Sequence, residues 1–148
     1  MNYIRREIES SVKNLVDSFK VVLITGPRQV GKSTMLKELF RNEYHYVSLD
    51  DINELQMAQS DPKLFFINHP GKLIIDEVQY CPDLFIEIKR LVDQKDESGQ
   101  FILTGSQTFS LMGNVSESLA GRVGILELKP LSTREILRER KDAPFKPS

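Results

Sequence analysis

The sequence predicts an α/β protein, built as a three-layer α/β/α sandwich around a five-stranded, mostly parallel sheet. Two observations predict this fold class. Short runs of Val, Ile and Leu recur along the chain, as expected of strands buried on both faces. Between these runs, apolar residues are spaced by three or four positions, which indicates amphipathic helices. Strands that alternate with such helices form βαβ units, and these units assemble into a parallel sheet with helices on both faces.

The first half of the chain supplies three of the expected strands. Asp61 directly precedes Pro62, which is typical of an N-cap followed by proline in the first turn, so two short helices are expected to meet there. We expect helices over residues 4–19, 32–41, 53–60 and 62–68, and strands over residues 21–24, 45–49 and 73–75.

The second half continues the same alternation. Pro82 is expected to open a helix that Gly99 closes, and residues 107–120 are expected to be helix and loop, broken by Gly113. The last two strands are expected over residues 101–103 and 123–128. Ser132 to Glu135 has the form of a capping box, which predicts a helix from near Thr133. Residues 1–131 are thus expected to form one domain with an N-terminal helix, and residues 132–148 the start of a C-terminal helix.

Length and composition exclude several classes of protein. The chain has 148 residues, and at about 100–200 residues per domain it is expected to form one domain. Twenty Lys and Arg against 21 Asp and Glu give a net charge of −1, which excludes a protein that binds nucleic acid through bulk positive charge. The single cysteine, Cys81, excludes an internal disulfide. No apolar run approaches the length of a membrane span, so we expect a soluble cytoplasmic protein with no membrane partner.

A phosphate-binding loop follows the first strand. Residues 26–33 match the pattern G-x-x-x-x-G-K-[ST], which a random chain of this length matches well under ~1% of the time. In such a loop the backbone N–H groups surround a phosphate at the start of a helix, Lys32 contacts the β- and γ-phosphates, and Ser33 ligates Mg²⁺. The residues expected to bind the nucleotide are Gly26, Pro27, Arg28, Gln29, Val30, Gly31, Lys32, Ser33 and Thr34.

An acidic pair ends the strand at residues 73–75. Asp76 is expected to hold the Mg²⁺ together with Ser33, and Glu77 to polarise a water for attack on the γ-phosphate. Acidic pairs at strand ends are also common helix caps, but the phosphate-binding loop upstream favours the catalytic interpretation. The residues between the two motifs hold one strand and short helices. This fits a strand inserted between the two motif strands, as in hydrolysing P-loop enzymes that use a glutamate.

Two further positions are candidates with open alternatives. Thr104 and Ser106 end the next strand, and either could contact the γ-phosphate or the attacking water, while the plain alternative is a turn at Gly105. Arg122 could stabilise transition-state charge, either in its own subunit or in a neighbour, or it could be a solvated arginine before a strand.

These motifs together resemble the AAA-type P-loop ATPases and, more narrowly, the prokaryotic AAA_14 domain, which a DUF4143 region usually follows. The likeness covers nearly the whole chain, and it is carried by residues 26–33, 46–51, 74–79, 103–106, 119–123 and 128–132. The resemblance implies that ATP is bound and hydrolysed with Mg²⁺ as cofactor on an α/β/α sandwich.

One departure from the AAA pattern concerns the C-terminal part. AAA-type proteins usually carry a helical lid and a nucleotide-sensing arginine after the fifth strand, but only 18 residues follow Pro130 (148 − 130). We therefore expect a lid or partner domain outside this chain. The sequence favours an ATPase with ATP and ADP as ligands, and the alternative is an ATP-gated binding module with little turnover.

The partners of the domain are less well defined by the sequence. A homo-oligomer is compatible with the motifs, since Arg122 could act on a neighbouring subunit. The tail from Lys129 to Ser148 has six basic against three acidic residues, which is usually a solvated helix face and only a weak sign of a nucleic-acid surface.

Overall fold

The structure of the protein is a computed structural model, and it describes residues 2–27, 32–106 and 108–128. The helices are α1 (Asn2–Ser18), α2 (Lys32–Phe40), α3 (Ile52–Ser60), α4 (Pro62–Asn68), the 3₁₀ turn η2 (Val78–Tyr80), α5 (Leu84–Val92) and α6 (Phe109–Ser118). The strands are β1 (Val21–Thr25), β2 (His45–Ser48), β3 (Leu73–Asp76), β4 (Phe101–Gly105) and β5 (Val123–Glu127).

The strands that the structure describes form one sheet in the order β2-β3-β4-β1-β5, and all neighbouring pairs are parallel. Leu103 in the middle of β4 pairs with Leu23 on one side and with Ile75 on the other. One strand is therefore inserted between β1 and β3, but it is not the strand that lies between the two motifs in the sequence, so that part of the prediction is wrong. The inserted strand is β4, which comes later in the chain, whereas β2 lies at the edge of the sheet.

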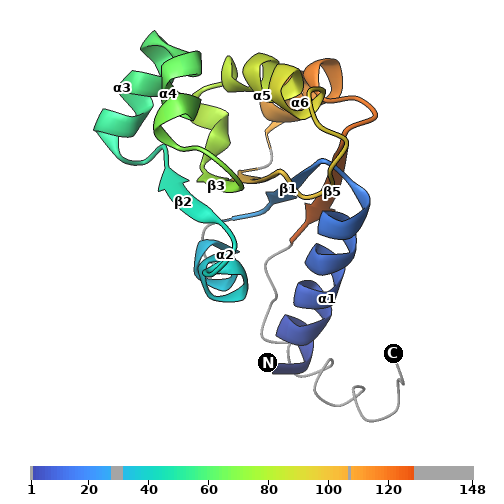
Figure 1. Cartoon of the computed structure of the whole chain (residues 1–148). Coiled ribbons are helices and arrows are strands. Elements are labelled where there is room, and N and C mark those ends of the chain that lie inside the picture. The colour runs from blue at the N-terminus through green and yellow to red at the C-terminus, as the bar shows by residue number, and fades with distance from the viewer. Residues whose placement is uncertain (1, 28–31, 107, 129–148) are drawn as a thin grey trace.

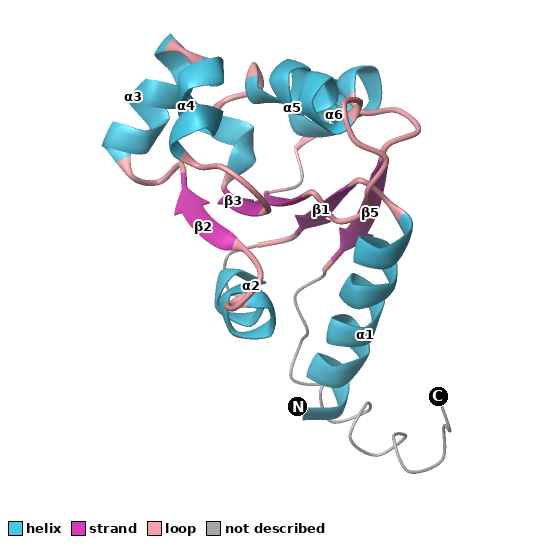
Figure 2. Cartoon of the chain, viewed as in Figure 1, coloured by secondary structure: helices cyan, strands magenta, loops and turns pink. Residues whose placement is uncertain are grey.

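Helices cover both faces of this sheet, which confirms the three-layer sandwich (Figures 1 and 2). Alternate residues of β1 face opposite layers, as the period-2 geometry of a strand requires. Val22 and Ile24 pack in the cluster that includes Val12 of α1 and Leu36 of α2. Val21 and Leu23 pack toward α3, α4, α5 and α6, in the larger cluster that also contains Phe65, Phe85 and Val115.

Local signals account for most helix boundaries, with two corrections. The helix expected to end at Gly99 is α5, and it already ends at Val92. The Asp61 side chain accepts a hydrogen bond from Leu64 N–H at 3.1 Å, which confirms the predicted N-cap. The predicted break at Gly113 is wrong, because α6 runs through it from Phe109 to Ser118. The Thr108 side chain caps this helix, and Leu111 and Val115 are buried, so packing and capping outweigh the cost of about 1 kcal/mol of one interior glycine.

Two predicted features lie outside the described residues. They are the middle of the phosphate-binding loop, residues 28–31, and everything from residue 129 on, including the expected domain boundary at 131 and the helix start near Thr133. Among the residues that the structure describes, no helix has the length and apolar character needed to cross a membrane.

Candidate functional site

The candidate site lies at the edge of the sheet where β1, β3 and β4 end. Gly26 follows β1 and its N–H donates to the carbonyl of Gly105, which ends β4, at 3.2 Å. A Cβ at Gly26 would lie 2.5 Å from the carbonyl oxygen of Leu128, and its φ of +153° is one that other residues rarely adopt. The chain can therefore leave β1 in this direction only because residue 26 is glycine.

The described part of the phosphate-binding loop brings two polar side chains to the start of α2. Lys32, the first residue of α2, is only 2% exposed, and Ser33 is half-buried beside it. Thr34 is exposed. Free backbone N–H groups and the helix dipole make the start of a helix a favourable place for an anion.

Asp76, at the end of β3, accepts hydrogen bonds from three hydroxyl groups. Ser33 Oγ donates to its Oδ1 at 3.0 Å, and the Thr104 hydroxyl donates to the same oxygen. Tyr46 Oη donates to Oδ2 at 2.7 Å. The carboxylate is buried (6% exposed), so these donors replace the water that would otherwise solvate it.

Glu77 has an unusual backbone conformation. With φ 58° and ψ 48°, it is the single non-glycine residue with positive φ among the described residues. Such a conformation costs of order 1–3 kcal/mol and is found mainly at functional sites. The Glu77 N–H donates to Thr104 Oγ1 at 3.1 Å, which supports the strained peptide.

The carboxyl group of Glu77 also contacts a neighbour that links it to the next strand. Gln79 Nε2 donates to Glu77 Oε1 at 3.4 Å, and Gln79 Oε1 accepts from the Ser106 N–H at 3.3 Å. Gly105 makes room for this amide, because a Cβ there would lie 2.7 Å from Gln79 Oε1. The side chain of Glu77 is therefore coupled to the loop that follows β4.

Thr104 and Ser106, the two candidates for contact with the γ-phosphate, occupy different positions. Thr104 is fully buried, and its single hydroxyl proton is directed at Asp76. Ser106 is half-buried beyond the end of β4. In this arrangement the Thr104 hydroxyl donates its proton to Asp76, so it does not donate to a phosphate. Its geometry is that of a group that orients Asp76 and Glu77.

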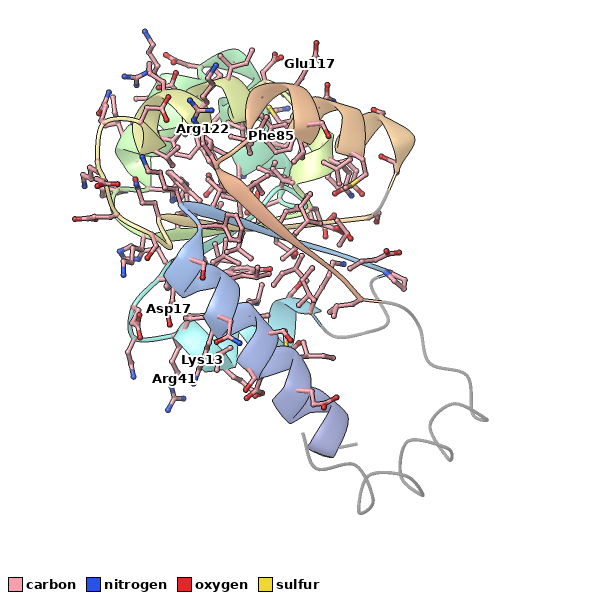
Figure 3. The ribbon with its side chains drawn as sticks, turned by 90° about the vertical axis from the view of Figure 1, so that its right-hand side faces the viewer. Lys13, Asp17, Arg41, Phe85, Glu117 and Arg122 are labelled. Carbon is pink, nitrogen blue, oxygen red and sulfur yellow. The ribbon has the colours of Figure 1, made fainter. Side chains whose placement is uncertain are left out.

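Arg122 lies away from the other candidate residues. Its carbonyl accepts from the N–H of Val21, the first residue of β1, so it lies at the opposite edge of the sheet from Lys32. Its guanidinium binds the Asp93 carboxylate through two hydrogen bonds, of 2.6 and 2.9 Å, and these lower the pKa of Asp93. In Figure 3, Arg122 lies on the side of the sheet with Phe85, and Arg41, which follows α2, lies on the other. The structure thus does not bring Arg122 to the site of its own chain.

Two residues of the site were not singled out as site residues from the sequence: Tyr46 and Gln79. Burial, followed by the hydrogen bond to Asp76, raises the pKa of the Tyr46 phenol above its usual value. Gln79 is two residues after Glu77, and its role depends on the turn η2, which bends the chain back toward β4. Both lie in segments that carry the family resemblance, but nothing in local periodicity marks them as polar site residues.

A family model described as an AAA domain, AAA_14, matches residues 18–137. The chain belongs to the AAA_14 family. Among curated proteins, this AAA_14 domain is 37% identical over 133 residues to the uncharacterized proteins Rv2008c of Mycobacterium tuberculosis and Mb2031c of Mycobacterium bovis. The matched part is 89% of this chain but 30% of each relative, so the chain spans less than a third of the length of these relatives.

Solved structures support the same fold. The AAA_14 domain matches the P-loop NTPase domain of the sigma-54 transport activator from E. coli with a TM-score of 0.54 and 14% identity, covering 89% of this chain and 99% of that one. It matches Saccharomyces cerevisiae RIF2 with a TM-score of 0.52 and 11% identity, covering 92% of this chain and 59% of that one. At these identities the likeness shows the α/β fold of P-loop NTPases.

The donor set of this AAA_14 domain suits a magnesium ion. Ser33 Oγ and the Asp76 carboxylate are oxygen donors 3.0 Å apart at the start of α2. Mg²⁺ prefers oxygen ligands and usually takes only one or two from the protein, with water and substrate phosphates completing its shell. The residues present therefore fit the cation that the sequence motif implies.

Proposed function

We propose that this AAA_14 domain binds Mg·ATP and hydrolyses it to ADP and phosphate. The hydrogen bond between Ser33 and Asp76 carries the proposal, because it joins residues 43 positions apart that belong to the two motifs. These residue types are brought together where a phosphate chain and its metal would lie. The family match and the P-loop NTPase fold support the proposal.

The phosphates would be bound at the start of α2. The nearly buried ammonium group of Lys32 supplies positive charge there, and low exposure strengthens its attraction for the β- and γ-phosphates. Ser33 and Asp76 would hold the Mg²⁺, which when bound neutralises charge on the phosphate oxygens. Nucleotide, metal and protein then meet at one edge of the sheet.

Glu77 is the candidate general base. It directly follows Asp76, and the residue is 2% exposed, so a water that its carboxyl group contacts would be shielded from bulk solvent. A positioned carboxylate that accepts a proton from an attacking water contributes about 10²–10⁴-fold to a rate. Strained backbone conformations are found mainly at functional sites, where the orientation of a side chain is needed for the chemistry. The backbone of Glu77 is strained in this way.

One observation favours a second candidate function, an ATP-gated binding module with little turnover. The Gln79 amide holds the Glu77 carboxyl group to the loop after β4. If this contact persists when nucleotide is bound, Glu77 is restrained from activating water. The domain would then bind nucleotide and change the surface that it presents to a partner.

Substitution of Lys32 and Glu77 distinguishes these functions. We expect Lys32→Ala to weaken nucleotide binding at least tenfold, and Glu77→Gln to keep the affinity while turnover falls about 10²–10⁴-fold. Titration with a fluorescent ATP analogue and phosphate release measure the two quantities. Lys89→Ala, at an exposed lysine of α5, is the matched control and is expected to change neither.

The results for the two variants distinguish hydrolysis from gated binding. Unchanged affinity in Lys32→Ala would overturn nucleotide binding at this site. Tight binding by the wild-type protein with turnover that Glu77→Gln does not reduce would favour the gated module instead.

A further inference from the structure

We propose that Tyr46 is a positioning residue of the metal site, where its phenol fixes the Asp76 carboxylate in the orientation that Mg²⁺ requires. The proposal rests on the Mg·ATP binding proposed above and adds a residue to that site. It concerns an edge strand, β2, that the phosphate-binding motifs do not include.

The sheet register brings Tyr46 to the correct face. Tyr46 pairs with Ile74 across the parallel ladder between β2 and β3. Ile74 and Asp76 are two residues apart on β3, so their side chains point to the same face of the sheet, and Tyr46 faces the same way. This is the face covered by α2, which begins at Lys32 and carries Ser33.

Tyr46 makes one contact through its hydroxyl and another through its ring. Its hydroxyl oxygen lies 2.7 Å from Asp76 Oδ2. Lys37, one turn along α2 from Ser33, places its ammonium nitrogen 4.1 Å from the ring centroid, which is a cation–π contact. Tyr46 thus connects the edge strand to the helix that follows the phosphate-binding loop, with its hydroxyl directed at the carboxylate.

The consequence is that both oxygens of Asp76 are restrained. Ser33 and Thr104 donate to Oδ1, and Tyr46 donates to Oδ2. A carboxylate held on both sides cannot rotate freely, so Asp76 is kept facing Ser33. Groups that orient a metal ligand in this way change metal affinity or activity about 10–100-fold when they are removed.

Tyr46→Phe tests this role, because it removes one hydroxyl and keeps the ring against Lys37. The probe is a fluorescent ATP analogue, titrated first in EDTA and then at increasing Mg²⁺. We expect the affinity in EDTA to match that of the wild-type protein. The Mg²⁺ concentration that gives half of the affinity gain should rise about 10–100-fold.

Tyr44→Phe is the matched control. Tyr44 is a buried tyrosine directly before β2, and its hydroxyl donates to the carbonyl of Gly99 at 2.5 Å rather than to Asp76. We expect this variant to respond to Mg²⁺ as the wild-type protein does. Thermal unfolding of both variants without Mg²⁺ and nucleotide shows whether either change acts through stability alone.

Several results would overturn the proposal. An unchanged Mg²⁺ midpoint in Tyr46→Phe, or an equal loss of affinity in EDTA and in Mg²⁺, removes the role of Tyr46 while Mg·ATP binding stands. A wild-type protein whose nucleotide affinity does not respond to Mg²⁺ overturns both proposals. If Tyr46→Phe does not fold, Tyr46→Leu takes its place, because it also removes the hydroxyl, and an unchanged midpoint there counts against the proposal in the same way.

Discussion

At the scale of single residues, one threonine hydroxyl connects the two acidic residues of the site. Thr104 Oγ1 accepts from the N–H of Glu77 at 3.1 Å and donates its proton to Asp76. The first bond supports a strained backbone, and the second orients the carboxylate that we propose as a metal ligand. Because Thr104 is fully buried, no water can replace either bond when the hydroxyl is lost.

Thr104→Val is therefore expected to affect both stability and turnover. The change preserves the shape of the side chain but leaves the buried Glu77 N–H without its partner, which costs about 1–3 kcal/mol of unfolding free energy. A small displacement of Asp76 and Glu77 should also lower turnover roughly 10²-fold. Urea unfolding and phosphate release measure the two effects.

Thr104→Ser is the control for this prediction. It keeps the hydroxyl and loses a methyl group, so it should lose only about 1 kcal/mol of stability and retain most of its turnover. If the valine and serine variants lose turnover equally, the hydroxyl does not position the acidic pair.

The residues of the site differ in how well the sequence predicts them. Four residues belong to motifs whose spacing follows from the geometry of a strand, a loop and a helix: Lys32, Ser33, Asp76 and Glu77. Their place at the end of the sheet where β1 and β3 finish could therefore be predicted. The contact of Tyr46 with Asp76 depends on which strands are neighbours and in which register. That information is not local in the sequence.

At the scale of elements, glycine has opposite effects at two positions. Gly113 lies inside α6, where it suggested a break, but the helix is continuous and a Cβ there would meet nothing within 4 Å. Gly124 lies in β5 beneath α1, where a Cβ would lie 2.5 Å from a ring carbon of Phe19 and 2.9 Å from a methyl carbon of Leu15. The first glycine weakens a helix, and the second allows a helix to approach the sheet.

We therefore expect Gly113→Ala to stabilise the protein and Gly124→Ala to destabilise it. The first change adds a good helix former in open space, which is worth about 0.5–1 kcal/mol. The second forces α1 and β5 apart and should cost about 1–3 kcal/mol through overpacking. The urea midpoints of the two variants and the wild-type protein check both signs, and a fall in stability with Gly113→Ala would contradict the continuous helix.

The order of the strands in the sheet cannot be derived from local sequence patterns. The central strands β1, β3 and β4 could be located because a strand buried on both faces is a largely continuous apolar run. An inserted strand between β1 and β3 could be predicted, but the prediction pointed to β2, whereas the inserted strand is β4. Its identity depends on how the helices pack across the whole sheet.

At the scale of the whole molecule, different groups lie where the strands begin and where they end. The strand ends at Thr25, Asp76 and Gly105 face the phosphate-binding loop. The opposite edge carries the ion pair between Arg122 and Asp93, next to a cavity of about 540 Å³ that both residues line. An arginine at that edge cannot reach a phosphate bound at the first edge of the same chain, so any catalytic role of Arg122 requires a second copy.

This geometry leads to a prediction for Arg122→Ala. Nucleotide affinity should stay at the wild-type value, because the guanidinium lies away from Lys32 and Ser33. If Arg122 acts on a neighbouring copy, the turnover per molecule of the wild-type protein rises with protein concentration, and Arg122→Ala loses that rise. The effect of an arginine supplied in trans is about 10³–10⁵-fold in related phosphoryl-transfer systems, so the loss should be large.

Asp93→Ala separates this role from a structural one, because it breaks the same ion pair but keeps the arginine. We expect it to retain the rise in turnover with concentration, or to increase it, since the guanidinium is then released from its partner. Phosphate release measured over a range of protein concentrations compares the three proteins. If Arg122→Ala and Asp93→Ala lose turnover equally, the ion pair matters for structure alone. If the turnover of the wild-type protein does not depend on its concentration, Arg122 has no catalytic role in trans.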